Sequence, residues 1–189
     1  MTGVVLKRAM SERGNDLYQT PKVAVEALLR VERLPPQLWD PCSGPGNIVD
    51  VLRAHGHQVI GSDLVDYGRP DFFSHRDFLM ERKAPDGCEG VVMNAPFKLA
   101  AEFIAHALDL SPLVIALARL AFMESECRTP ILEGRGLARI HVFRQRLPMM
   151  HRHGWEGRKA NSAMAFGWFV WDRSHMGPTT IDRISWERP

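Results

Sequence analysis

Long apolar runs are missing from this sequence of 189 residues. No stretch of about 18 apolar residues is available to span a membrane, and the first thirty residues carry charges throughout instead of a secretory apolar stretch. We therefore expect a soluble, cytoplasmic protein with no membrane partner. Cysteine is also scarce: Cys42, Cys88 and Cys127 are odd in number and show neither CxxC spacing nor a disulfide framework. We expect three reduced, partly buried thiols.

Metal and nucleotide-triphosphate motifs are likewise missing. His151 and His153 have HxH spacing but no cysteine or clear acidic third ligand, so no metal site is predicted. No GxxxxGK[ST] loop for a nucleoside triphosphate is present. The GxG at Gly44 and Gly46 is followed by Val49 three residues later, so a dinucleotide-binding fingerprint fits poorly.

The length and composition fit one globular domain, with 45% hydrophobic and 24% charged residues. Residues 1–16 are polar and aperiodic, which predicts a flexible N-terminal arm before a single domain over residues 17–189. Nothing in the sequence requires an oligomer.

The net charge of +2 conceals an uneven distribution. Between Arg135 and Ala160 seven basic residues face one acid, Glu156, so this segment carries +6 and the rest of the chain must carry −4. A local basic stretch is the electrostatic footprint of a nucleic-acid partner, although a solvated charged face is the commoner explanation. Three histidines of the segment, His141, His151 and His153, would add positive charge at lower pH.

Hydrophobic periodicity predicts alternating strands and helices. Thr20 is expected as the N-cap of a helix that starts at Pro21 and extends to about Val31. The later expected strands are 37–40, 57–63, 91–93 and 113–117, and the later expected helices are 47–55 and 99–110. This alternation predicts an α/β fold with a mostly parallel sheet covered by helices on both faces. Strands at 138–143 and 163–171 should add an antiparallel C-terminal hairpin at one end of the sheet, with Trp168 and Trp171 in packing positions.

A Gly-containing turn, Asp-Pro-Cys-Ser-Gly-Pro-Gly-Asn, follows the first expected strand at residues 40–47. Gly44 and Gly46 permit a tight turn whose amides can face a ligand at the start of the next helix. Asp63 ends the second strand, where its carboxylate can accept hydrogen bonds from two ribose hydroxyls, and Asp40 can accept from an amino group. The structural alternative is a generic turn, with Asp63 as a helix cap.

The tetrapeptide Asn94-Ala95-Pro96-Phe97 ends a third expected strand. An exocyclic amine is a poor nucleophile, but hydrogen bonds from the amine to the Asn94 amide oxygen and the Ala95 carbonyl oxygen would favour tetrahedral geometry and attack on a methyl sulfonium. Phe97 can stack on the planar group that bears the amine. Taken alone, an Asn turn before proline is more often structural.

Together these motifs resemble the class I S-adenosylmethionine-dependent methyltransferases, and within them the amino-methyltransferase branch. The similarity to small phage- and prophage-type DNA N6-adenine methyltransferases covers nearly the whole chain and implies a Rossmann-like fold. It also implies S-adenosylmethionine as the cofactor and S-adenosylhomocysteine as the product. By this resemblance the Tyr-x-Thr-Pro element and the Gly turn bind the cofactor's methionine end, the second acid binds the ribose, an Asp-Phe pair binds the adenine and the tetrapeptide is catalytic. The matching positions are Tyr18, Thr20, Pro21; Asp40, Pro41, Gly44, Gly46; Asp63 with Leu64; Asp77, Phe78; and Asn94 to Phe97.

One position departs from the family pattern, because Ala95 stands where the family has proline. The backbone carbonyl remains, but the turn loses rigidity. A non-catalytic cofactor- or nucleic-acid-binding module is therefore an alternative to an active enzyme.

The residues expected to bind nucleic acid are Lys98 and Arg146 together with Arg152, Trp155, Arg158 and Lys159 of the segment 149–162. Cations suit phosphates and Trp155 suits stacking beside an extruded base. DNA adenine is the expected acceptor, with RNA adenine or a protein glutamine amide as enzymatic alternatives. The short chain leaves little room for a recognition region, which predicts low or short-site sequence specificity.

Overall fold

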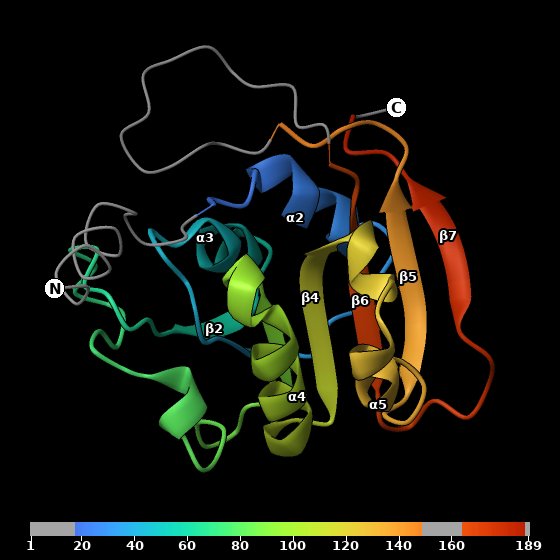
Figure 1. Ribbon diagram of the computed structural model, residues 1–189. Coiled ribbons are helices and arrows are strands. Elements are labelled where there is room, and N and C mark those ends of the chain that lie inside the picture. Colours follow the sequence, from blue (N-terminus) through green and yellow to red (C-terminus); the bar gives the residue numbers. More distant parts are fainter. Residues whose placement is uncertain (1–17, 149–163, 188–189) are drawn as a thin grey trace, which may run out of the picture.

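The computed structural model describes residues 18–148 and 164–187. Strands and helices alternate over most of this range (Figure 1). The strands are β1 Gln37–Asp40, β2 Gln58–Gly61, β3 Gly90–Met93, β4 Leu113–Arg119, β5 Leu137–Phe143, β6 Phe166–Asp172 and β7 Thr180–Ile184. The α-helices are α2 Lys22–Leu29, α3 Asn47–Ala54, α4 Ala100–Leu110 and α5 Thr129–Leu132. Short 3₁₀ turns are η1 Phe78–Met80, η2 Phe97–Leu99, η3 Leu120–Met123 and η4 Glu126–Arg128.

The strands form one seven-stranded sheet in the order β2-β1-β3-β4-β6-β5-β7. The pairs β1 with β2, β1 with β3, and β3 with β4 are parallel. Strand β6 is antiparallel to both of its neighbours, β4 and β5, whereas β7 is parallel to β5. The sequence therefore predicted the fold class correctly: a mostly parallel α/β sheet with an antiparallel pair in its C-terminal part.

Two hydrophobic clusters cover opposite faces of the sheet. Because side chains alternate along a strand, neighbours such as Leu38 and Trp39, or Trp168 and Phe169, belong to different clusters. The first cluster includes Ala24, Val25, Ala27 and Leu28 of α2 and Ile48, Val49, Val51 and Leu52 of α3. The second includes Phe103, Ile104, Ala107 and Leu108 of α4, with Phe78 of η1 and Ile131 of α5. Three layers result, and the edge where β1 and β3 end lies between them.

The start of the first described helix differs from the expectation. The helix begins at Lys22, Pro21 is the N-cap, and no side chain caps it. The carbonyl of Thr20, a buried residue, accepts a hydrogen bond from the Asn47 amide nitrogen at 2.8 Å. This tertiary contact replaces the expected capping role of Thr20. The helix also ends at Leu29, which leaves Val31 outside it and 45% exposed.

The C-terminal part of the sheet is more elaborate than the expected terminal hairpin. Strand β6 lies between β4 and β5, so the hairpin is completed inside the sheet instead of beside it. The outer strand is β7, which the sequence did not predict because four of its five residues are exposed and give no apolar signal. Trp168 and Trp171 are fully buried, and their indole N–H groups donate to the carbonyls of Ala24 and Ile131. The interpretation of these tryptophans as packing residues is confirmed.

Part of the basic segment from Arg135 onward is used inside the fold. The Arg139 guanidinium and His141 Nε2 both contact the Glu32 carboxylate, and Arg135 pairs with Asp109. His141 is only 3% exposed. Burial by itself would raise the pKa of Glu32, but hydrogen bonds from His141 and Arg139 outweigh it and hold this pKa below its ordinary value. These three basic residues are therefore paired within the fold, whereas Arg144 and Arg146 of the same segment are exposed.

Two further findings concern membrane spans and cysteines. Among them, no helix is long and apolar enough to cross a membrane. All three cysteines are free, and Cys42 and Cys88 are partly buried as expected, whereas Cys127 is exposed. The expected N-terminal arm, residues 1–16, lies outside the described residues.

Candidate active site

A cavity of about 490 Å³ opens where β1 and β3 end and the chain leaves β2. This is the crevice in which open α/β sheets bind their ligands, and the volume lies within the usual range of about 300–1,000 Å³. Its walls come from four stretches far apart in sequence: 18–20, 40–48, 63–79 and 94–103. The lining residues named from sequence are Tyr18, Thr20, Asp40, Pro41, Gly44, Asp63, Leu64, Asp77, Phe78, Asn94, Ala95, Pro96, Phe97 and Lys98.

The Gly turn adopts backbone conformations that require glycine. Gly44 has φ 51° and Gly46 has φ 103°, both in the left-handed region. Helix α3 starts directly after the turn, and the Asp50 N–H donates to the Gly46 carbonyl at 2.8 Å. Gly46 does not line the cavity, however: a Cβ there would lie 2.5 Å from Arg69 Nη1 and 2.7 Å from Phe72 Cζ. Its missing side chain makes room for protein atoms, and the direct cofactor contact expected for Gly46 stays a prediction.

Asp40 is a buried carboxylate with incomplete hydrogen bonding. It is 1% exposed, and its Oδ1 accepts a long bond of 3.3 Å from the Cys42 N–H. Its Oδ2 has no hydrogen-bond partner among the described residues. Burial raises the pKa of Asp40 well above its ordinary value, and the nearby Asp63 adds to the effect. A carboxylate in this state is matched to a cationic ligand group, because the ligand charge would offset the cost of burial.

Asp63 holds the turn as well as facing the cavity. Its Oδ2 accepts from the Gly44 N–H at 2.8 Å and its Oδ1 accepts from the Val65 N–H at 2.9 Å. Burial raises the pKa of Asp63, although these backbone bonds oppose the shift. Each oxygen retains a second lone pair for a hydroxyl donor. Leu64 beside it is 61% exposed and supplies an apolar wall.

Asp77 and Phe78 lie on the far wall of the cavity. The Asp77 side chain accepts from the Leu79 N–H at 3.1 Å and so caps η1. Phe78 is 2% exposed and packs against Trp39, Phe103 and His106, so its ring is anchored in the core while its residue borders the cavity.

Asn94 has its amide orientation fixed by a backbone contact. Its Nδ2 donates to the Tyr18 carbonyl at 2.8 Å, and because a carbonyl can only accept, the amide oxygen must point the other way. Asn94 Oδ1 is buried and has no hydrogen-bond partner among the described residues. This residue of the cavity lining therefore has an amide oxygen that lacks a donor among the described residues. Ala95, the departure from the family pattern, is 5% exposed and packs within the second hydrophobic cluster.

Phe97 packs against two rings and one cation. The Tyr18 ring stacks on it with centroids 4.7 Å apart and an interplanar angle of 27°, and the Phe166 ring is tilted against it at 5.8 Å. The Arg119 guanidinium carbon lies 4.2 Å from its centroid. Tyr18 lines the cavity and Arg119 does not. Residue 18 thus contacts both ends of the tetrapeptide, Asn94 through its carbonyl and Phe97 through its ring.

The remaining predicted site residues fall into three groups. Pro21 and Gly46 lie next to lining residues but do not border the cavity. Lys98 is exposed at the cavity, whereas Arg146 is exposed away from it. Arg152, Trp155, Arg158 and Lys159, with the whole segment 149–162, lie outside the described residues.

Several lining residues carried no assignment from the sequence: Gln19, Cys42, Ser43, Asn47, Ile48, Tyr67, Arg76 and Phe103. Asn47 parallels Asn94, because its amide holds the carbonyl of Thr20 as Asn94 holds that of Tyr18. Its position directly after Gly46, the last glycine of the turn, is the sequence signal that could have identified Asn47 as a site residue. Burial raises the pKa of the Cys42 thiol, which keeps it protonated and unreactive.

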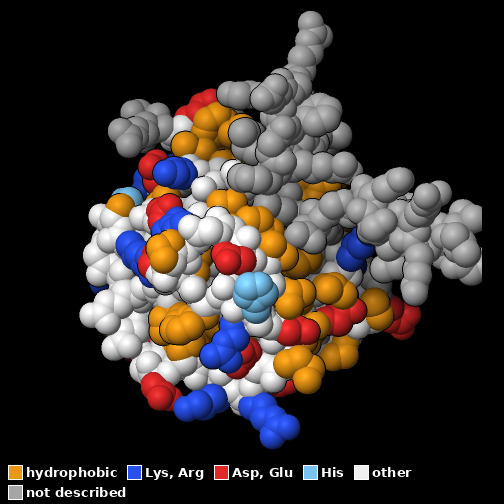
Figure 2. Space-filling view, turned by 90° about the vertical axis from the view of Figure 1, so that its left-hand side faces the viewer, with side chains coloured by type: hydrophobic (Ala, Val, Ile, Leu, Met, Phe, Trp, Pro, Cys, Tyr) orange, Lys and Arg blue, Asp and Glu red, His pale blue; other side chains and the backbone are white. Residues whose placement is uncertain are grey.

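Charges near the site are mixed in sign. Figure 2 shows the side of the molecule on which β2 lies in Figure 1, and there Lys and Arg side chains alternate with Asp and Glu around hydrophobic ones. The described side chains on this face form no single basic patch. No group of three His, Cys, Asp or Glu among the described residues is arranged to hold a metal ion.

Comparisons with known proteins identify the fold of the chain. No family model matches the sequence, and no curated protein matches it either. Solved structures do match. A protein described as the modification subunit of a type I restriction enzyme from Vibrio vulnificus has a TM-score of 0.59 at 14% identity, with 93% of this chain and 48% of that chain covered. A protein described as an RNA methyltransferase from Pyrococcus horikoshii has a TM-score of 0.57 at 14% identity, with 88% and 95% covered. The chain has a Rossmann-like methyltransferase fold.

A third structure, described as an O-methyltransferase from Agrobacterium tumefaciens, matches with a TM-score of 0.57 at 13% identity, covering 88% of this chain and 86% of that chain. The chain spans about half the length of the Vibrio subunit. At these identities the likeness concerns the fold alone, and a fold does not define an acceptor. The acceptor has to be argued from the cavity.

Proposed function

We propose that this protein transfers a methyl group from S-adenosylmethionine to an exocyclic amine, and that the amine is N6 of adenine in DNA. The observation that carries the proposal is Asn94, whose amide nitrogen is held by the Tyr18 carbonyl and whose buried oxygen lacks a donor within residues 18–148 and 164–187. An oxygen in this state is suited to accept a hydrogen bond from an amine N–H. This proposal extends the fold-level likeness with the chemistry of particular side chains.

The cavity residues fit the cofactor. The unpaired Oδ2 of Asp40 suits the ammonium of a methionine moiety. The carboxylate of Asp63 suits ribose hydroxyls, and Asp77 with Phe78 forms an edge for the adenine. When bound, S-adenosylmethionine supplies a methyl group on a positively charged sulfur and becomes S-adenosylhomocysteine on losing it. The acidic character of Asp40 and Asp63 matches the positive charges of such a ligand.

Asn94 and Ala95 orient the acceptor amine. The Asn94 amide oxygen and the Ala95 carbonyl oxygen accept its two N–H bonds, which leaves the nitrogen lone pair directed at the methyl group. As the nitrogen bonds to the methyl carbon, the carbon–sulfur bond would break with its electron pair going to sulfur, and the methylated amine would release one proton to water. Neither residue changes its protonation state, so positioning and fixed dipoles account for the rate.

Phe97 selects a planar acceptor. Its ring already stacks on that of Tyr18. An acceptor base that stacks on Phe97 has to displace the Tyr18 ring and replaces the contact that is lost. Stacking of a nucleobase on an aromatic side chain is worth about 1–3 kcal/mol, whereas a glutamine amide offers a far smaller flat surface to replace that contact. This difference favours a base over a protein side chain, and an extruded base over a paired one.

Adenine in DNA is the acceptor that the family resemblance favours. The resemblance rests on the Tyr-x-Thr-Pro, Gly-turn, Asp-Phe and tetrapeptide elements, and the structure brings residues of all four to one cavity. Lys98 at the cavity offers a cation for a phosphate.

The experiment that tests the proposal is methyl transfer from labelled S-adenosylmethionine to DNA, followed by mass analysis of the digested product. Wild-type protein should yield N6-methyladenine. Asn94→Ala should still bind S-adenosylhomocysteine but transfer methyl at least about 100-fold more slowly, since one essential hydrogen-bond acceptor is gone. Gln145→Ala is the matched control: Gln145 also has a buried amide oxygen without a partner among the described residues, but it lies away from the cavity and should be dispensable.

Each alternative predicts a different result. Methyladenine in RNA, or methylglutamine in protein, with none in DNA would reject the DNA acceptor and retain the amino-methyltransferase. Cofactor binding without transfer to DNA, RNA or protein would reject the enzyme and identify a binding module. Unchanged transfer by Asn94→Ala would reject the role given to its amide oxygen.

A further inference from the structure

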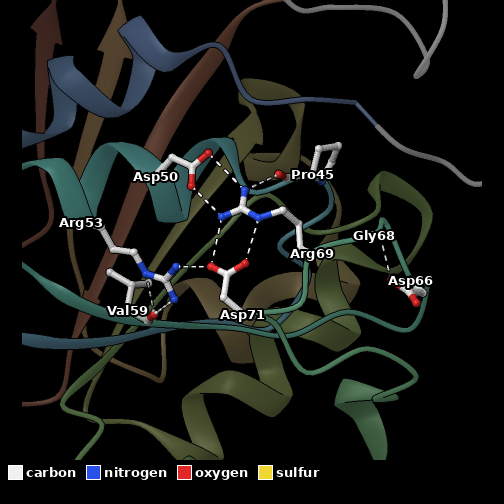
Figure 3. Close-up of polar contacts among 8 residues, drawn as sticks. All are labelled: Pro45, Asp50, Arg53, Val59, Asp66, Gly68, Arg69 and Asp71. Atoms are coloured by element: carbon white, nitrogen blue, oxygen red, sulfur yellow. Dashed lines mark hydrogen bonds and ion pairs between the residues drawn. The ribbon is translucent and has the colours of Figure 1, made fainter.

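A network of two arginines and two aspartates lies behind the Gly turn (Figure 3). The Arg69 guanidinium is at its centre. Its Nη1 and Nη2 contact the two oxygens of Asp50 at 3.2 and 2.9 Å, and its Nε and Nη2 contact the two oxygens of Asp71 at 3.0 and 3.1 Å. Its Nη1 also donates to the Pro45 carbonyl at 2.9 Å. Arg69 thus joins the turn, the first part of α3 and the segment that follows β2.

Two glycines leave room for this arrangement. Arg69 lies over the Phe72 ring, 4.2 Å from its centroid. A Cβ at Gly46 would meet Arg69 and Phe72, and a Cβ at Gly61 would lie 2.8 Å from the Phe72 ring. The guanidinium and the ring therefore fill the space that side chains on the turn and on the end of β2 would need. Such complementary packing indicates a specific position, not a loose surface ion pair.

The network joins two stretches that line the cavity. Pro45 belongs to the Gly turn. Asp71 and Phe72 belong to the segment after Asp63 whose earlier residues, Leu64, Val65 and Tyr67, form the 64–67 wall. A small void of about 10 Å³ bordered by Gly44, Asp63, Arg69 and Phe72 shows that the network lies directly behind residues that face the cavity. Arg69 itself does not line the cavity.

The two arginines and two aspartates of the network balance in charge, and the central pair of Arg69 and Asp71 favours the ionised forms. Hydrogen bonds from Arg69 and Arg53 hold the pKa of Asp71 far below its ordinary value, while the bonds to Asp71 and Asp50 raise the pKa of Arg69. All four side chains keep 27% to 42% of their surface exposed. Exposed ion pairs of this kind contribute little to stability, so the consequence of the network should be sought in geometry.

We propose that Arg69 is a positioning residue for the cofactor: it fixes the separation between the Gly turn and the 64–67 wall by bonding Pro45 on one side and packing on Phe72 on the other. It acts through these residues and does not touch the cofactor. The proposal rests on the proposed function only for the identity of the ligand, S-adenosylmethionine, and it does not depend on the acceptor. Without Arg69, the two walls have to be ordered when the cofactor binds, which weakens binding.

The test compares S-adenosylhomocysteine binding by calorimetry in wild-type protein, Arg69→Gln and Arg53→Gln. Arg53 is a matched control, because it pairs with the same Asp71 and lies 5.6 Å from the same Phe72 ring but has no contact with the turn. Arg69→Gln should weaken binding about tenfold, and Arg53→Gln should stay within about twofold of wild type. Arg69→Lys keeps the charge but lacks the planar fork, so its affinity should fall between the two.

Thermal unfolding without ligand separates a positioning role from a structural one. A merely structural Arg69 would lower the unfolding temperature and leave the dissociation constant, measured well below that temperature, unchanged. That result, or equal weakening by both glutamine variants, would overturn the proposal. Failure of wild-type protein to bind S-adenosylhomocysteine would instead overturn the cofactor assignment itself. If Arg69→Gln does not fold, equal affinity of Arg69→Lys and wild type would also overturn the positioning role.

Discussion

Asp40→Asn should stabilise the ligand-free protein and weaken cofactor binding. The substitution keeps the shape of the side chain and removes a charge that is 1% exposed. In the native structure this charge has one long hydrogen bond, from the Cys42 N–H at 3.3 Å, and an oxygen without a partner among the described residues. Asp63 nearby adds repulsion, since it also contributes to the raised pKa of Asp40. The residue is thus costly to the fold and useful to the site.

The sign of the pH dependence follows from the raised pKa. A carboxyl whose pKa is higher in the folded than in the unfolded state destabilises the fold once the pH exceeds the ordinary value, 3.8 here, and the cost grows until the pH reaches the folded value. At neutral pH, removal of the buried charge should be worth about 1–3 kcal/mol. For a domain of this size each kcal/mol corresponds to about 2–4 °C in unfolding temperature.

The same substitution should weaken cofactor binding. Loss of a charge-assisted bond to the ligand ammonium costs about 1.5–3 kcal/mol, which corresponds to about tenfold to a hundredfold in the dissociation constant.

The assay is thermal and denaturant unfolding of both proteins between pH 4 and pH 8, about the range over which buried carboxyls ionise, together with calorimetric titration by S-adenosylmethionine. The stability difference should vanish at the acidic end, and wild-type affinity should improve as the pH rises while that of Asp40→Asn stays flat. Lower stability of Asp40→Asn at neutral pH would refute the reasoning about the unpaired oxygen. Equal cofactor affinity of the two proteins would refute the ammonium contact.

Two further predictions concern the turn and the Glu32 cluster. Gly46→Ala should lose more unfolding free energy than Gly56→Ala in urea denaturation: both residues have positive φ, 103° and 92°, and share a strain of about 1–3 kcal/mol, but only at Gly46 would a Cβ meet other atoms. Equal losses would contradict the packing role of Gly46. Glu32→Gln should cost about 1–3 kcal/mol at pH 7, and the deficit should shrink as the pH falls below the ordinary glutamate value of 4.5, because a lowered pKa means that the stabilisation is lost on acidification. Asp109→Asn, which removes an exposed ion pair, is the control and should change stability by less than about 1 kcal/mol. A stability deficit in Glu32→Gln that stays constant with pH would contradict the ionic role of Glu32.

Local sequence patterns predict many of the residues that line the cavity. The residues at the ends of β1 and β3 were found because glycine, proline and asparagine turns have short-range signatures, and parallel strands bring such turns to one edge. Residues that act through tertiary contacts left no such signal. Arg69 and Phe72 occur in a segment without periodicity, and their relation to Gly46 depends on folding. The pairing of Arg139 and His141 left no signal for the same reason, because their partner Glu32 is more than a hundred residues away.

The central place of β6 has a consequence for how the chain folds. Strand β4 is complete at Arg119, but the strand that covers its open edge begins at Phe166. During synthesis the apolar edge of β4 remains unpaired until this later segment has emerged, so a shortened chain would present an adhesive strand of the kind that seeds aggregation. Pairing across such a sequence separation also slows folding, because a long loop must close before the contact forms. The C-terminal part of the sheet therefore controls the solubility of the growing chain, although the residues assigned to catalysis lie upstream of it.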